Sequence, residues 1–142
     1  GRPMTCFASR SANQHEPVHL VWANEDVCCI LDHAPFNEGH VLVMPKKHIR
    51  YFDEMDKRTA SSVMEAIGIV SRALKEVFHP DGITVCQNGG IFDELTHLHL
   101  HIIPRYEGQN FADFYVEDEE NQCLEAHQLQ ETKRKLARVI KS

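Results

Sequence analysis

The sequence predicts a mixed fold in which a long helix lies across a β-sheet. Two short apolar segments, Val18–Ala23 and Val27–Leu31, are separated by the polar turn Asn24-Glu25-Asp26, which is typical of a β-hairpin. Between Asp53 and Phe78 the apolar residues recur every three or four positions, and this spacing indicates an amphipathic helix. Because such a helix must bury its apolar face, we expect it to pack against the sheet.

Three further strands and a second helix are expected along the rest of the chain. Asp56 is expected to cap the start of the long helix, and Pro80-Asp81-Gly82 is expected to stop it. In the second helix the basic residues cluster late, where they complement the negative end of the helix dipole. The additional elements are strands at His40–Met44, Ile83–Gln87 and Leu98–Ile103, and a helix within Leu124–Ile140.

The composition limits the classes of protein to which the chain can belong. A length of 142 residues with 42% hydrophobic residues suits one ordinary domain, expected over residues 4–142, and Gly1-Arg2-Pro3 is typical of a cloning remnant. The formal net charge of −6 argues against a general affinity for nucleic acid, because neutralising phosphates takes a basic surface. No apolar stretch approaches the length of a membrane span, so we expect a cytoplasmic protein with no membrane partner.

The most informative stretch of the sequence holds three histidines, His97, His99 and His101, at alternate positions among apolar residues. In a strand, side chains alternate between the two faces, so three imidazoles would line one surface while Leu98 and Leu100 enter a core. Neutral imidazole can be a nucleophile, a proton carrier or a metal ligand near neutral pH. The alternative is a structural ladder of hydrogen-bonded histidines with no chemical role.

The triplet alone is compatible with two kinds of chemistry. In the first, one histidine attacks phosphorus while its neighbours supply protons and hydrogen bonds to the phosphate oxygens. In the second, two or three histidines hold a divalent metal that activates water. Asp93 and Glu94 are near enough in sequence to add metal ligands, whereas the turn at Gln87-Asn88-Gly89-Gly90 offers the amides and backbone donors that suit phosphate.

Two segments of the chain together resemble the histidine triad family of nucleotide hydrolases and transferases. Residues 97–106, HLHLHIIPRY, resemble the family signature, and residues 32–48, DHAPFNEGHVLVMPKKH, resemble its upstream pattern. The resemblance implies an α+β fold with a five-stranded antiparallel sheet, a crossing helix and a C-terminal helix. It also implies a homodimer, which is often built through the strand and helix that precede the triad.

The resemblance further implies a role for particular residues. His99, the middle histidine, would attack an α-phosphate, and water would then hydrolyse the nucleotidyl-His99 intermediate. His101 would bond to the phosphate or bridging oxygen, while His97 would orient the site and His40 would pack beside it. The implied substrate-binding residues are Asp32 on the ribose hydroxyls, Ile30 and Phe7 beside the base, and Gln87 or Asn88 on the phosphate side.

The implied activity is hydrolysis at the α-phosphorus of a dinucleoside polyphosphate or a nucleoside phosphoramidate, with a purine nucleotide such as AMP as product. We expect the covalent step to need no metal, although magnesium can accompany a polyphosphate substrate. Some bacterial members hold a structural zinc through a Cys-x-x-Cys pair and histidines similar to His48 and His97. Here Cys6 is followed by Ser9 in place of the second cysteine, so no zinc is expected.

Glu94 is the clearest departure from the family pattern. Many members have Ser or Thr at this position, where the hydroxyl bonds phosphate, and a carboxylate there repels an anionic substrate unless it is protonated or turned away. Glu94 is therefore the reason to keep, as an alternative, a nucleotide-binding module with little turnover. A metal-dependent hydrolase is the third hypothesis, and it predicts that a chelator abolishes activity.

Overall fold

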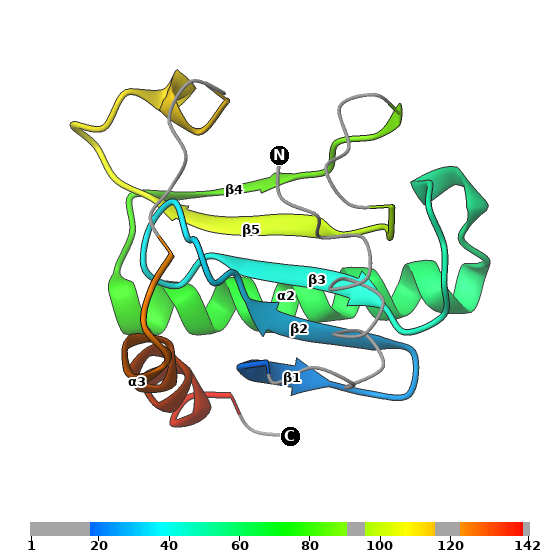
Figure 1. The fold of residues 1–142 in the computed structure, drawn as a ribbon, viewed down its shortest axis with the longest axis horizontal. Coiled ribbons are helices and arrows are strands. Elements are labelled where there is room, and N and C mark those ends of the chain that lie inside the picture. The colour runs from blue at the N-terminus through cyan, green and yellow to red at the C-terminus, as the bar shows by residue number, and fades with distance from the viewer. Residues whose placement is uncertain (1–17, 91–95, 116–122, 141–142) are drawn as a thin grey trace.

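The computed structural model describes residues 18–90, 96–115 and 123–140 (Figure 1). In this part of the chain no helix is both long and apolar enough to cross a membrane. The strands are β1 (Leu20–Ala23), β2 (Val27–Leu31), β3 (Val41–Pro45), β4 (Gly82–Cys86) and β5 (Leu100–Arg105). The helices are α2 (Lys57–Phe78) and α3 (Ala126–Ala137), with short 3-10 helices η1 (Phe52–Glu54) and η3 (Phe111–Tyr115).

The five strands form one antiparallel sheet in the order β1-β2-β3-β5-β4. Figure 1 shows α2 crossing one face of this sheet and α3 lying at one end of it. This arrangement confirms the predicted α+β class, the five-stranded antiparallel sheet, the crossing helix and the C-terminal helix. Because β5 lies between β3 and β4, the strand of the histidine triad is an interior strand beside β3.

The two faces of the sheet have separate apolar clusters, as the alternation of side chains in strands requires. The face toward α2 and α3 forms the main core, which takes alternate residues of β2 and β3. The intervening residues form a second cluster on the opposite face, made of Cys28, Ile30, Leu42 and Met44. His101 is the register partner of Leu42, so its side chain lies on this second face, away from α2.

Local polar groups close the turns and helix ends where the sequence predicts them. The side-chain oxygen of Asn24 accepts hydrogen bonds from the backbone N–H groups of Asp26 and Val27, which closes the hairpin between β1 and β2. Asp56 caps α2 by accepting from the Thr59 N–H at 2.8 Å. The helix ends at Phe78, and its C-cap residue His79 takes the left-handed conformation with φ 50° and ψ 49°.

The main departure from the predicted elements concerns the strand of the triad. Strand β5 begins at Leu100 instead of Leu98, because the Leu98 N–H bonds to the Ile49 carbonyl, in the loop between β3 and α2, at 2.6 Å. The prediction that His97 and His99 lie within the strand is therefore wrong. Strand β2 has the predicted bounds, and β1, β3 and β4 differ from the predicted strands by one or two residues at their ends. Strand β3 includes Pro45, which pairs with Val27.

Candidate active site

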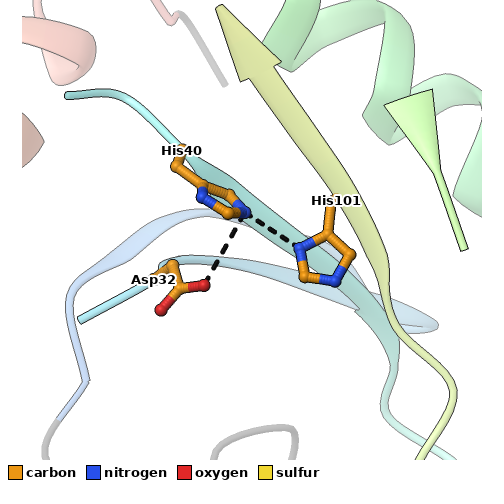
Figure 2. A group of neighbouring side chains, drawn as sticks. All are labelled: Asp32, His40 and His101. Carbon is orange, nitrogen blue, oxygen red and sulfur yellow. Dashed lines mark hydrogen bonds and ion pairs between the residues drawn. The ribbon is translucent and has the colours of Figure 1, made fainter. Parts of the chain in front are cut away.

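Asp32, His40 and His101 converge from three different segments on the face of the sheet away from α2 (Figure 2). Asp32 follows β2, His40 precedes β3 and His101 lies on β5. The Asp32 N–H donates to the His40 carbonyl at 2.9 Å, which continues the ladder between β2 and β3 by one pair. The sheet itself therefore holds the first two residues beside the third.

A chain of hydrogen bonds assigns the protons of His40 and His101. The backbone N–H of Phe36 donates to His40 Nδ1 at 3.0 Å, so this nitrogen carries the lone pair and the ring proton lies on Nε2. His40 Nε2 then donates to His101 Nδ1 at 2.9 Å. The remaining proton of neutral His101 is consequently on Nε2, which Figure 2 shows on the side of the ring away from His40. We call this chain, Phe36 to His40 to His101, the histidine relay.

The carboxylate of Asp32 lies beside the histidine relay and is almost fully buried. One oxygen accepts the Ala34 N–H at 3.0 Å, and the other lies 3.6 Å from His40 Nε2. The negative charge next to His40 strengthens the polarisation of its Nε2–H bond. Contact of Asp32 with a ribose stays a prediction.

His99 lies next to His101, with their ring centroids 5.0 Å apart, and a nearby backbone carbonyl orients its ring. Its Nδ1 lies 2.9 Å from the carbonyl oxygen of His97. A carbonyl oxygen only accepts, so the proton of neutral His99 is on Nδ1 and the lone pair is on Nε2. A neutral imidazole with a free Nε2 lone pair is a nucleophile.

The imidazole of His97 is fully buried and takes no part in the histidine relay. Its Nε2–H donates to the Pro45 carbonyl at 2.7 Å, and its ring lies against that of His48, with centroids 5.3 Å apart. The backbone carbonyl of His97 accepts the hydrogen bond from His99 Nδ1, which is compatible with the predicted orienting role of His97. Its side chain anchors the start of the triad to the end of β3.

Burial keeps the relay histidines neutral. Desolvation, with a smaller repulsion from His99, lowers the pKa of His40 to about 3. Desolvation also lowers the pKa of His101 to about 3; repulsion from His40 and His99 adds to this, and attraction by Asp32 opposes it. Since both values lie well below the ordinary value for histidine, the two rings remain uncharged at neutral pH and act as hydrogen-bond donors and acceptors.

Asp32, His40 and His101 also place one ligand atom each within 4.8 Å of one another, the arrangement that a metal ion would require. A metal on His40 Nε2 would have to remove the proton from that nitrogen and force one onto Nδ1, which already faces the Phe36 N–H. The two ring nitrogens are also 2.9 Å apart, whereas tetrahedral zinc ligands lie about 3.4 Å apart. The observed hydrogen bonds therefore fit a relay better than a metal site.

Comparison with known proteins agrees with this geometry. The sequence model of the HIT (histidine triad) domain matches residues 13–108. A HIT-like protein of Methanocaldococcus jannaschii is 37% identical over 105 residues, which are 72% of this chain and 81% of that protein. The chain belongs to the HIT family. The crystal structure of a HIT-like protein from Bartonella henselae is similar, with a TM-score of 0.81, 32% identity and coverage of 94% of each chain.

Two further relatives have names that refer to enzymes. An adenosine 5′-monophosphoramidase of Schizosaccharomyces pombe is 32% identical over 77 residues, which are 53% of this chain and 55% of the relative. An adenylylsulfatase of Arabidopsis thaliana is 31% identical over 86 residues, which are 58% of this chain and 44% of the relative. The HIT family thus includes hydrolases of adenylyl compounds.

The other predicted site residues of this HIT protein are placed less directly. Ile30 has no exposed surface and packs with the second apolar cluster, so its contact with a nucleobase stays a prediction. Strand β4 ends at Cys86, the register partner of His101, so Gln87 and Asn88 leave the sheet beside the triad. The Gln87 side chain donates to the Asn88 carbonyl at 2.7 Å. Phe7, Cys6 and Glu94 lie outside the described residues, so their predicted roles and the expected absence of zinc stay untested.

Sequence reasoning missed the aromatic residues that surround the histidine relay of this HIT protein. Phe114 of η3 packs against both His40 and His101, and Phe36 packs against Phe114. Arg105, at the end of β5, is buried beside the Phe36 ring. The sequence carries a weak signal for them, since aromatic residues are frequent from Phe111 to Tyr115 in an otherwise polar stretch.

Proposed function

We propose that this HIT protein hydrolyses a nucleoside phosphate derivative at its α-phosphorus through a covalent nucleotidyl-His99 intermediate. The observation that carries the proposal is the hydrogen bond from His99 Nδ1 to the His97 carbonyl. This bond favours the tautomer that carries its proton on Nδ1, so the Nε2 lone pair is available for attack. It also stabilises the positive charge that the ring acquires when Nε2 bonds to phosphorus.

In the first step, the Nε2 lone pair forms the bond to phosphorus, and the leaving group departs with the electrons of its own bond to phosphorus. In the second step, the oxygen of a water molecule attacks phosphorus, and the N–P bond breaks to restore His99. A leaving amine takes a proton from solvent as its bond to phosphorus breaks, and the attacking water returns one proton to solvent in the second step. The products are a nucleoside monophosphate and the protonated leaving group, so atoms and charge balance.

His101 contributes the Nε2–H group that the histidine relay leaves free. A neutral N–H that points at the leaving atom stabilises the negative charge that develops there, without having to lose its proton. His40 fixes this arrangement because it occupies the other nitrogen of the His101 ring. Burial keeps both rings neutral in the free protein, so the Nε2–H of His101 is in place when the substrate binds.

The relatives support an adenylyl group as the part of the substrate that is transferred, with AMP as product. A nucleoside phosphoramidate and a dinucleoside polyphosphate remain the two substrate classes of the proposal. No metal takes part in the covalent step of this scheme. A magnesium ion would serve only to neutralise the charges of a polyphosphate leaving group.

The experiment that tests the proposal is trapping of the intermediate. The protein is mixed with adenosine 5′-phosphoramidate, with and without a chelator, and quenched in denaturant at alkaline pH. We expect mass spectrometry to find one adenylyl group on His99, in equal amount in both samples. Turnover that a chelator abolishes would instead identify a metal-dependent hydrolase, and tight AMP binding without product would identify a binding module.

We propose in addition that the protein is a homodimer joined through β4 and α2. Strand β4 is an outer strand of the sheet, and Val85 on it is 45% exposed. Met64 on α2 is 66% exposed. Unpaired strand edges with exposed apolar residues favour association with another chain, as the family resemblance also implies.

Val85→Lys is expected to convert the dimer into a monomer in sedimentation velocity, because the new charge would be desolvated at the joined edge. Phe52→Lys is the matched control, since Phe52 is 63% exposed on η1, and it should leave the oligomeric state unchanged. A wild-type protein that sediments as a monomer, or a Val85→Lys variant that remains dimeric, would contradict this interface.

A further inference from the structure

Phe114 contacts both rings of the histidine relay and a neighbouring aromatic ring. Its ring centroid lies 5.5 Å from that of His101 and 5.9 Å from that of His40, with interplanar angles of 68° and 71°. It also lies 5.6 Å from the Phe36 ring at 81°. One side chain from η3 thus makes edge-to-face contacts with both relay imidazoles and with the residue whose N–H starts the relay.

The segment that carries Phe114 is itself fastened by residues that have no part in the chemistry. Arg105 donates to the Phe111 carbonyl at 2.7 Å and to Thr84 Oγ1 at 3.0 Å. Its guanidinium lies 5.0 Å from the Phe36 ring and 5.0 Å from the Phe111 ring, between the two segments. We call Phe36, Arg105, Phe111 and Phe114 the aromatic cap.

A second link joins the same two segments through a pair of side-chain amides. The side-chain amides of Asn37 and Gln109 donate to each other's oxygens at 3.0 Å. Asn37 also donates to the Pro104 carbonyl at 2.7 Å. The loop that leads to His40 and the segment that leads to Phe114 are therefore connected at two places, both of which precede Phe114 in the chain.

We propose that Phe114 is a positioning residue, which holds the His101 ring in the orientation that points Nε2–H at the leaving group and keeps water off the His40–His101 hydrogen bond. The expected effect on kcat rests on the proposed function. The expected effect on the orientation and protonation of the His101 ring rests on the structure alone. The proposed role needs no phosphate contact from Phe114, because it rests on the contacts of this ring with the two imidazoles and with Phe36.

The physical reason is that an imidazole pair joined by one hydrogen bond has two ways to fail. The His101 ring can rotate about its side-chain bonds, which turns Nε2 away, or water can solvate the nitrogens, which favours protonation of His101 at Nδ1 and breaks the relay. The titratable groups that act on His101 are His40, His99 and Asp32, and its neighbour from η3 is the uncharged Phe114 ring. An apolar ring at this place opposes both failures.

The kinetic test compares two adenylyl substrates whose leaving groups differ in basicity, an alkylamine and a nitrophenolate. Phe114→Ala is expected to lower kcat by about tenfold to a hundredfold for the amine but by less than about threefold for the nitrophenolate, with little change in KM. A weakly basic leaving group needs little stabilisation, so it does not report on the direction of His101 Nε2–H. Equal losses for both substrates would overturn the proposal.

The second test observes the rings directly and needs no turnover. In wild-type protein, ring-nitrogen NMR resonances of His101 are expected to stay those of the neutral form from about pH 8 to about pH 5, since burial lowers the pKa of His101 to about 3. In Phe114→Ala the ring is hydrated, so its pKa should rise toward the ordinary 6.5 and it should titrate in this range. A His101 that stays neutral in both proteins would overturn the proposal even if the enzyme were inactive.

Two variants separate positioning from loss of folding. Phe114→Leu keeps an apolar group over the relay, so kcat for the amine should return to within about threefold of wild type and His101 should stay neutral. Phe52→Ala makes the same chemical change at an exposed site and should alter neither measurement. If Phe114→Ala does not fold, Phe114→Leu and Phe114→Ser decide the matter, and identical NMR titrations of His101 in both would refute the proposed role.

Discussion

Replacing His99 with glycine is expected to lower kcat by about ten-thousandfold or more, because the reaction loses the atom that forms the bond to phosphorus. Water would then have to displace the leaving group in a single step, without the positive imidazole that stabilises the intermediate. His101 and Asp32 remain in place, so nucleotide affinity should change little. The measurement is steady-state turnover of adenosine 5′-phosphoramidate together with the dissociation constant of AMP.

The matched control is His79→Gly, which makes the same change at the C-cap of α2, where the backbone is left-handed. Glycine adopts this conformation without strain, so activity should be unchanged and the protein slightly stabilised. Free imidazole added to the His99→Gly variant should restore part of the turnover by acting in the vacated space. Full activity of His99→Gly would refute the nucleophile assignment.

Removing the His101 imidazole is expected to have the second-largest effect, a loss of about a hundredfold to a thousandfold in kcat for a basic leaving group. His101→Leu deletes the Nε2–H group while it fills much of the same volume. The His40 Nε2–H loses its acceptor in this variant, since the Asp32 oxygen 3.6 Å away lies beyond hydrogen-bond distance. The loss therefore combines the missing donor with the broken relay, whereas an amide in this place would keep both.

His101→Gln is the companion variant, because its amide can accept from His40 Nε2 and still present an N–H to the leaving group. It should retain about ten times more activity than His101→Leu for the amine substrate. Both variants should still form the adenylyl adduct with a nitrophenolate leaving group. A His101→Leu enzyme as fast as wild type with the amine would show that Nε2–H does not assist departure.

Most of the fold could be predicted from local patterns in the sequence. Apolar periodicity decides which residues enter the core, so the hairpin, the long helix and the order of elements were all foreseeable. The ends of elements depend on contacts that are distant in sequence. Strand β5 begins late because the Leu98 N–H donates to the Ile49 carbonyl, in a loop that precedes the long helix. The residues around Leu98 do not predict that hydrogen bond.

The candidate site divides in the same way. The motif made His99 and His101 recognisable, but alternation in the sequence placed all three imidazoles on one surface. The structure instead turns the His97 side chain to the Pro45 carbonyl and leaves only its backbone carbonyl beside His99. The partnership of His40 with His101 spans 61 residues and follows from the pairing of β3 with β5. The position of Phe114 beside the relay could not be predicted, because it depends on where η3 packs and not on the neighbouring residues in the sequence.

The paired amides of Asn37 and Gln109 have a consequence for the conditions under which the segments around the histidine relay stay joined. Neither side chain carries a charge or takes up a proton over the ordinary range of pH. Salt therefore does not screen these two hydrogen bonds, and a lower pH does not break them. By contrast, the exposed ion pair of Lys135 with Glu38 weakens as ionic strength rises. The loop that leads to His40 is thus joined to the segment before Phe114 by a contact that salt and pH leave unchanged, and to α3 by an ion pair that salt weakens.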